Sequence, residues 1–112
     1  MLARINRVVD GDDLRLISRQ GKKFRSPLFV ASFVATVSDK PARFGFITSK
    51  QVGGAVMRNR AKRRLRALAA RTLTQHPAGV DVVVRATGDT GTVSFANLAA
   101  EWRRFEEKAF VA

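Results

Sequence analysis

Residues 43–75 read RFGFITSKQVGGAVMRNRAKRRLRALAARTLTQ, and this stretch decides the fold because it joins a strand to a long helix. The strand is predicted over 43–49. Gln51–Gly54 predicts a flexible turn into the helix. The helical pattern then runs from Ala55 to about Gln75, where Pro77 ends it because proline disfavours helical backbone in the residue before it.

The predicted helix has two faces when its residues are placed about 100° apart. Leu65 marks the side expected to pack on the sheet, and the residues on the same side are Met57, Ala61, Leu68, Ala69 and Thr72. The opposite side carries Arg60, Arg63, Arg64 and Arg71, with Arg66 at its margin. Guanidinium groups are planar, always charged and weakly hydrated, which favours phosphate as their partner.

The start of this helix predicts a second feature for anions. Its first turn lies beside Gly53 and Gly54 and offers free amides together with the positive end of the helix dipole. The simplest alternative interpretation is that the basic side of this helix only faces solvent and binds nothing. Such a helix usually spaces Glu four residues from Lys or Arg, whereas residues 55–75 contain no acid. We therefore predict contact with nucleic acid, with solvation, acidic lipid or a targeting signal as the alternatives.

The flanking segments predict one α+β domain over residues 1–112, an α/β sandwich in the order α-β-β-α-β-α with room for one more short strand. They are a helix over Asp10–Gln20, a basic loop over Lys22–Arg25, a strand over Leu28–Val37, a third strand over Val80–Arg85 and a helix from Ser94 to about Phe110. The short turn at Ser38–Pro41 predicts that the strands before and after it are antiparallel.

Local signals refine these elements. Asp10 or Asp12 is expected to cap the first helix, and Gly21 to end it in a left-handed conformation. Strand alternation predicts one face with Phe29, Ala31 and Phe33, which we expect in the core, and another with Val30, Ser32 and Val34. Helical spacing predicts the buried stripe of the last helix to be Phe95, Leu98, Ala99, Trp102 and Phe105.

The charge is strongly one-sided. The chain has 21 Lys and Arg against 9 Asp and Glu, a net charge of +12. Between Leu14 and Val80 the only acid is Asp39, while fifteen basic residues occur from Arg15 to Arg71. A merely soluble protein would intersperse its charges, so we expect an anionic partner.

Other function classes find little support. The chain has no cysteine, and its one histidine, His76, is expected at the end of a helix, so neither nucleophilic catalysis nor a cysteine zinc site is predicted. Asp10, Asp12 and Asp13 fit capping better than metal binding. The absence of a long apolar run, and of a signal-peptide core in Met1–Arg7, predicts a cytoplasmic protein without a membrane contact. No small-molecule ligand is expected.

Residues 44–66, FGFITSKQVGGAVMRNRAKRRLR, closely resemble the signature of the protein subunit of bacterial ribonuclease P, with its Arg-Asn-Arg segment at Arg58-Asn59-Arg60. Gly21 with residues 25–30, and the helix containing Trp102, also look like that family. The resemblance covers about residues 6–110. It implies a sandwich similar to the second domain of a small-subunit ribosomal protein, with a left-handed β-α-β crossover around the basic helix.

The resemblance also implies a function. The partner in that family is a large catalytic RNA that removes the 5′ leader from precursor tRNA with magnesium ions held mainly by the RNA, and one protein is expected per RNA. The protein alone should not cut RNA, and no residue is predicted to be catalytic or to bind metal. The positions expected to contact RNA are Lys50, Gly53, Gly54, Arg58, Asn59, Arg60, Lys62, Arg63, Arg64 and Arg66. A structural RNA-binding protein of the ribosomal kind remains the alternative, and a protein-only nuclease is disfavoured.

The family holds the single-stranded leader in a cleft between its first helix and the sheet, and here the sequence departs from the family pattern. The corresponding residues are Leu14, Ser18, Val30 and Ser32. Only Leu14 stays bulky at a position where the family commonly has an aromatic ring, and none of the four can stack a base as such a ring does. We expect leader binding at this cleft either to be weaker or to rest more on backbone contacts and charge.

Overall fold

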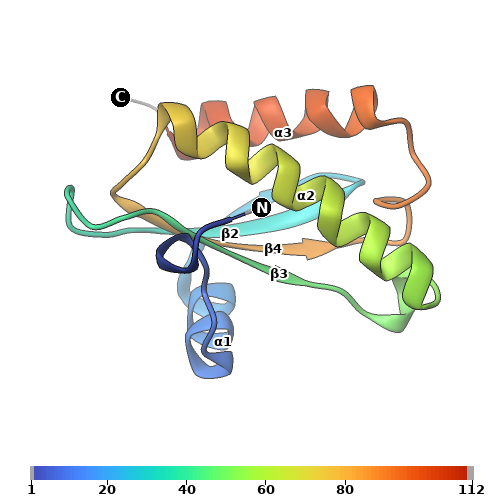
Figure 1. The fold of residues 1–112 in the computed structure, drawn as a ribbon, viewed down its shortest axis with the longest axis horizontal. Helices are drawn as coiled ribbons and strands as arrows, with labels where there is room; N and C mark the ends of the chain where they lie inside the picture. The colour runs from blue at the N-terminus through green and yellow to red at the C-terminus, as the bar shows by residue number, and fades with distance from the viewer. Residues whose placement is uncertain (1, 111–112) are drawn as a thin grey trace.

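A computed structural model describes residues 2–110; residue 1 and residues 111–112 of the predicted domain lie outside the described residues. Figure 1 shows one sheet with helices on both faces. In chain order the elements are η1 (Arg4–Asn6), α1 (Gly11–Gln20), β1 (Lys22–Arg25), β2 (Phe29–Ala35), β3 (Arg43–Ile47), η2 (Lys50–Val52), α2 (Ala55–Gln75), β4 (Val80–Ala86) and α3 (Phe95–Ala109). The predicted α+β class and all three predicted helices are confirmed.

The strand order is β1-β2-β4-β3, which corrects the predicted pairing. β4 pairs antiparallel with β2 and parallel with β3, so β4 lies between the two strands joined by the turn. β2 and β3 do run in opposite directions as predicted, but they are not neighbours. The reason is the long α2 connection, which returns the chain to the middle of the sheet and makes β3-α2-β4 a parallel unit. The left-handedness of this crossover stays a prediction.

The predicted basic loop over Lys22–Arg25 is wrong, because these residues form the edge strand β1, paired antiparallel with β2. The alternation of buried and exposed residues in β1 is hard to recognise in the sequence, because three of its four residues are basic. Phe24 is buried between the rings of Phe29 and Phe105, with centroid distances of 5.8 and 6.0 Å, while its basic neighbours point to the other face. The possible extra strand of the prediction is therefore β1.

The main core lies between the sheet and the pair α2 and α3, which run side by side on one face (Figure 1). Phe29 and Phe33 belong to this core, as predicted, and Trp102 lies over Phe29 with ring centroids 5.6 Å apart. A smaller cluster on the opposite face joins Val8, Ile17 and Val83 beneath α1. The sheet thus has a thick apolar layer on one side and a thin one on the other.

Two local predictions need correction. Gly21 is extended, with φ −69° and ψ 157°, rather than left-handed. A β-carbon there would lie 2.8 Å from the Ile17 carbonyl oxygen and 2.9 Å from the Phe33 amide nitrogen, so glycine is needed for space. Phe95 is 39% exposed because it begins α3, ahead of the turns that reach the sheet. Ser94 caps α3 as expected, with its side chain accepting from the Asn97 amide.

Candidate nucleic-acid interface

The inner side of α2 is the one predicted from its helical phase. Ala61, Leu65, Leu68, Ala69 and Thr72 are buried. Met57 is half-buried rather than fully covered, since it lies near the open end of the helix. Thr72 also links α2 to α3, because its hydroxyl donates to Glu106 at 2.6 Å and accepts from the Trp102 indole at 2.8 Å. Packing and these hydrogen bonds fix the rotation of α2 about its axis.

That rotation turns the basic side outward. Among the residues expected to contact RNA, those on the outer side of α2 are exposed: Asn59, Arg60, Arg63 and Arg66. Arg58 and Lys62 are half-buried on its flanks. Within residues 2–110, none of the ion pairs involves a cation of α2. These cations keep their charge unneutralised, which suits a phosphate backbone.

Arg64 differs from its neighbours. Its guanidinium group donates to the carbonyl oxygens of Thr90 and Val93 in the loop before α3. Burial against this loop, and then the nearby charge of Arg60, lower the pKa of Arg64, which still stays charged. Arg64 therefore anchors a loop, and its contact with RNA stays a prediction.

The start of α2 has the features expected of an anion site. Gly53 has a φ of 124°, a region that favours glycine, and Gly54 is the N-cap without a side-chain cap bond. The amides of the first turn are thus free of a capping side chain. Lys50 in η2 is exposed just before them. These three residues and Arg58 bring cationic and amide donors to one end of the helix.

Hydrogen bonds join α1 to the sheet among the residues of the predicted leader cleft, and leader binding there stays a prediction. Ser32 is only 3% exposed, and its hydroxyl donates to the Ser18 carbonyl at 3.4 Å. The Lys23 ammonium donates to the Ser32 hydroxyl at 2.8 Å and to the same Ser18 carbonyl. Leu14 is half-buried against the cluster beneath α1. Of the four predicted residues, Leu14, Ser18 and Ser32 thus attach α1, and Val30 is left on the open sheet surface.

A row of cross-strand neighbours lies beside that contact. Arg25 pairs with Val30, Val30 with Arg85, and Arg85 with Ile47 in the register of the sheet. Both arginines are exposed and flank a half-buried valine. Neither Arg25 nor Arg85 was among the residues predicted to contact RNA. Alternation along β4 could have found the second, because Arg85 follows Val83 by two residues and must share its face.

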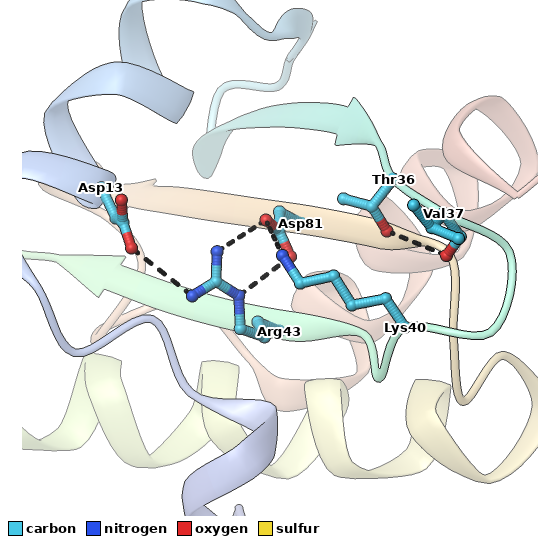
Figure 2. Close-up of polar contacts among 6 residues, drawn as sticks. All are labelled: Asp13, Thr36, Val37, Lys40, Arg43 and Asp81. Atoms are coloured by element: carbon cyan, nitrogen blue, oxygen red, sulfur yellow. Dashed lines mark hydrogen bonds and ion pairs between the residues drawn. The ribbon is translucent and has the colours of Figure 1, made fainter.

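A partly buried cluster of charges links β3, β4 and α1, as Figure 2 shows. Arg43 of β3 donates to Asp81 of β4 at 2.7 and 3.1 Å and reaches Asp13 of α1 at 3.5 Å. Burial alone would raise the pKa of Asp81, but hydrogen bonding to Arg43 and the charges of Arg43 and Lys40 lower it below its usual value. The hydrogen bond from Arg43 likewise raises the pKa of that guanidinium.

The acids of the first helix already have partners. Asp10 accepts from the Asp12 amide at 2.8 Å, which confirms Asp10 as the cap. Asp12 pairs with Arg15, and Asp13 with Arg43. Across residues 2–110 no three His, Asp or Glu side chains gather as a protein metal site requires. Nor is any helix in the described part of the chain long and apolar enough to cross a membrane.

Comparison with known proteins identifies relatives along nearly the whole chain. The profile of a family described as Ribonuclease P matches residues 2–109. The ribonuclease P protein component of Clavibacter michiganensis is 48% identical over 85 residues, covering 76% of this chain and 75% of that protein. The one from a Nocardioides species is 40% identical over 106 residues, covering 93% and 91%. The solved RNase P protein from Thermotoga maritima has the same fold, with a TM-score of 0.77 at 24% identity, covering 91% of this chain and 96% of that one.

Proposed function

The chain belongs to the ribonuclease P protein family, and we propose that the exposed side of α2 binds the catalytic RNA of this ribonucleoprotein enzyme while the sheet surface beside α1 binds the 5′ leader of precursor tRNA. One observation carries the proposal. The outer side of α2 presents a row of cations that have no acidic partner among residues 2–110. Such a row of unneutralised cations suits the negatively charged backbone of RNA.

The proposed contribution of the protein is electrostatic. A catalytic RNA and its precursor tRNA both carry one negative charge per phosphate, so they repel each other when they associate. A chain of net charge +12 placed between them offsets this repulsion. The described residues offer no nucleophile–base pair, and His76 stacks on Phe110 with centroids 4.5 Å apart. We therefore assign the cleavage chemistry to the RNA partner.

Magnesium ions belong with the RNA in this proposal. Asp12 and Asp13, the acids in the first turn of α1, both already pair with arginines. They do not fit a magnesium site, which needs free carboxylate oxygens. Phosphate oxygens of the bound RNAs supply that ligand type instead.

The leader is expected to follow the row Arg25–Val30–Arg85. Two exposed guanidinium groups, one on β1 and one on β4, lie on either side of β2 and can hold phosphates, and Val30 between them offers a small apolar contact for a base. Without an aromatic ring in this row, stacking contributes little, so leader binding should depend strongly on salt and weakly on leader sequence.

Reconstitution with the catalytic RNA of a bacterial ribonuclease P tests the proposal. We expect the protein to accelerate leader removal from precursor tRNA at low magnesium and to show no cleavage without the RNA. The double variant Arg60→Ala/Arg63→Ala should bind the catalytic RNA about 30-fold more weakly, or about 2 kcal/mol. The matched control Arg19→Ala/Arg103→Ala removes the same charge elsewhere and should bind nearly as the unmodified protein does.

Each alternative has its own outcome. RNA binding without acceleration of cleavage would point to a structural RNA-binding protein, and cleavage by the protein alone to a nuclease. Equal losses in the two double variants would mean that net charge, rather than the α2 surface, determines affinity. Titration to a saturation point of one protein per RNA would support the expected stoichiometry.

A further inference from the structure

A small hollow of about 200 Å³ lies at the free edge of β3, between the N-terminal segment and α2. Phe46 and Val9 form part of its apolar wall. Arg7, Lys62 and Arg66 surround it with three cations. Neither the RNA-contact positions on the outer side of α2 nor the leader surface beside α1 accounts for this combination of an aromatic ring and a cationic rim.

The hollow exists because the N-terminal segment pairs with β3 only briefly. The Val8 amide donates to the Phe44 carbonyl at 3.0 Å, and the described pairing of the two segments ends there. The chain then leaves the edge to reach the α1 cap at Asp10. Backbone groups alternate sides along a strand, so the N–H and C=O of Phe46 face the same edge as those of Phe44. The hollow therefore borders a strand edge able to hydrogen-bond a ligand.

The cations around the hollow are available to a ligand. Lys62 and Arg66 are one turn apart on the flank of α2. Neither they nor Arg7 takes part in an ion pair within residues 2–110. Arg66 also lines the shallow hollow on the outer side of α2 with Asn59 and Arg63. It thus connects the rim of the β3 hollow to the row of cations proposed to bind RNA.

These features together fit a nucleobase better than another ligand. At about 30 Å³ for each water, the hollow has room for about six waters, which suits one heteroaromatic ring system and is below the usual size of a drug-like site. A base can stack on Phe46 and hydrogen-bond the strand edge, and the cations can hold the phosphates on either side of it. The continuity through Arg66 with the outer side of α2 favours a nucleotide within a chain over a free one.

We propose that the hollow at the β3 edge receives one unpaired base of the RNA that α2 binds. This inference rests on the proposed function, because the same RNA must lie along α2. The base is inserted beside Phe46, and Arg7, Lys62 and Arg66 hold the adjoining phosphates. The protein then recognises an unpaired nucleotide at a defined position of its RNA, in addition to the sequence-independent attraction of charge.

Two pentanucleotides separate stacking from charge. One consists of five abasic ribonucleotides. The other is the same oligonucleotide with a 2-aminopurine at its central position, so the two differ by one base and have the same phosphates. We expect the full chain to bind the second about tenfold more tightly, with a fall in 2-aminopurine emission as the base stacks. Phe46→Leu keeps an apolar side chain but removes the ring, and it should abolish both the preference and the fall in emission.

Controls keep the result specific to the hollow. Phe95→Leu alters an exposed ring on α3 and should leave the preference unchanged. Lys62→Ala should weaken binding of both oligonucleotides by the same factor, because it removes only charge. Val9→Asn changes an exposed wall residue that the fold does not need, and we expect a two- to threefold loss confined to the base-containing oligonucleotide.

Two results would overturn the inference: equal affinity of the unmodified chain for both oligonucleotides, or a preference that survives both Phe46→Leu and Val9→Asn. Either result leaves the proposed function standing if the protein still accelerates leader removal with the catalytic RNA. Conversely, if acceleration is absent, the proposed function fails whatever the pentanucleotides show. Unfolding followed by the emission of buried Trp102 checks that each variant is folded.

Discussion

The outer side of α2 and the contacts that hold α1 on the sheet use charged residues in opposite ways. On the α2 face, an entire helix side carries cations without acidic partners among the described residues. On the α1 face, Arg43 and Lys40 pair with Asp81, Arg43 also reaches Asp13, and Lys23 bonds to Ser32. Charges that are paired within the protein hold its elements together, whereas unpaired charges are available to bind another molecule. The same residue types therefore have different functions at these two places.

The apolar layers on the two faces of the sheet differ in size, and this explains the different use of charge. A deep apolar layer that includes Leu65 and Trp102 holds α2 on the sheet. The residues on the outer side of α2 are therefore not needed for packing and can serve binding. α1 rests on a thin cluster around Ile17 and Val83 and needs polar contacts to stay in place. A cleft beside such a helix cannot use all of its polar residues for ligand binding. Ser32 illustrates this, because its hydroxyl donates to the backbone carbonyl of Ser18 and so joins β2 to α1.

The largest expected effect comes from breaking the ion pair on the α1 face. Asp81→Asn leaves Arg43 without its main partner and should lower the free energy of unfolding at pH 7 by about 3 kcal/mol. Chemical unfolding followed by Trp102 fluorescence measures this loss. Affinity for the catalytic RNA should stay within about twofold once the variant is folded, since Asp81 is on the face away from the exposed side of α2.

The pH dependence of stability tests the contribution of the Asp81 ion pair more specifically. The pKa of Asp81 is lowered in the folded chain, so its contribution to stability is full above the unfolded-state pKa of about 3.9 and is lost as the pH falls through the folded-state value. The difference in stability between the unmodified chain and Asp81→Asn should therefore shrink below about pH 4. Asp12→Asn, at an exposed pair, is the control and should change stability little. A difference that stays constant down to pH 2 would contradict this account of Asp81.

A smaller effect distinguishes two adjacent arginines of α2. Arg64→Ala removes hydrogen bonds to the loop before α3 and should cost about 1.5 kcal/mol of stability. Arg63→Ala should leave stability unchanged and weaken binding of the catalytic RNA, with the slope of log Kd against log salt lower by about 0.7–0.9. Thermal unfolding and salt-dependent binding of both variants measure the contrast. If Arg64→Ala changes the salt slope as much as Arg63→Ala does, Arg64 also contacts RNA.

Periodicity alone predicted the parts of the fold that have strong local signals. α2, with Leu65 inward and Arg63 outward, follows from its helical phase and from Pro77 beyond its end. β2, with Phe29 inward, follows from alternation. Both patterns depend only on residues near in sequence. They required no knowledge of which strands pair.

The remaining features depend on contacts distant in sequence. The place of β4 between β2 and β3 is decided by where α2 returns the chain, and a short turn at 38–41 falsely suggested neighbours. The ion pair of Asp81 could not be predicted from local patterns, because its partner Arg43 is 38 residues away. The contact of Ser18 with Ser32 could not be predicted either. It includes Lys23 of β1, and the high charge of residues 22–25 led to their prediction as a loop rather than a strand.

The smallest expected effect would make the leader surface more like an aromatic site. Val30 is half-buried between Arg25 and Arg85 on the open sheet, so a larger ring at this position can extend along the row without displacing α1. Val30→Tyr should tighten binding of precursor tRNA about fivefold, or about 1 kcal/mol, because one base of the leader gains a stacking partner. Binding of mature tRNA, which has no leader, should not change. Val30→Leu adds apolar volume without a ring and is the matched control. If Val30→Tyr tightens binding of mature tRNA equally, the row Arg25–Val30–Arg85 contacts the tRNA body, and the leader must bind elsewhere.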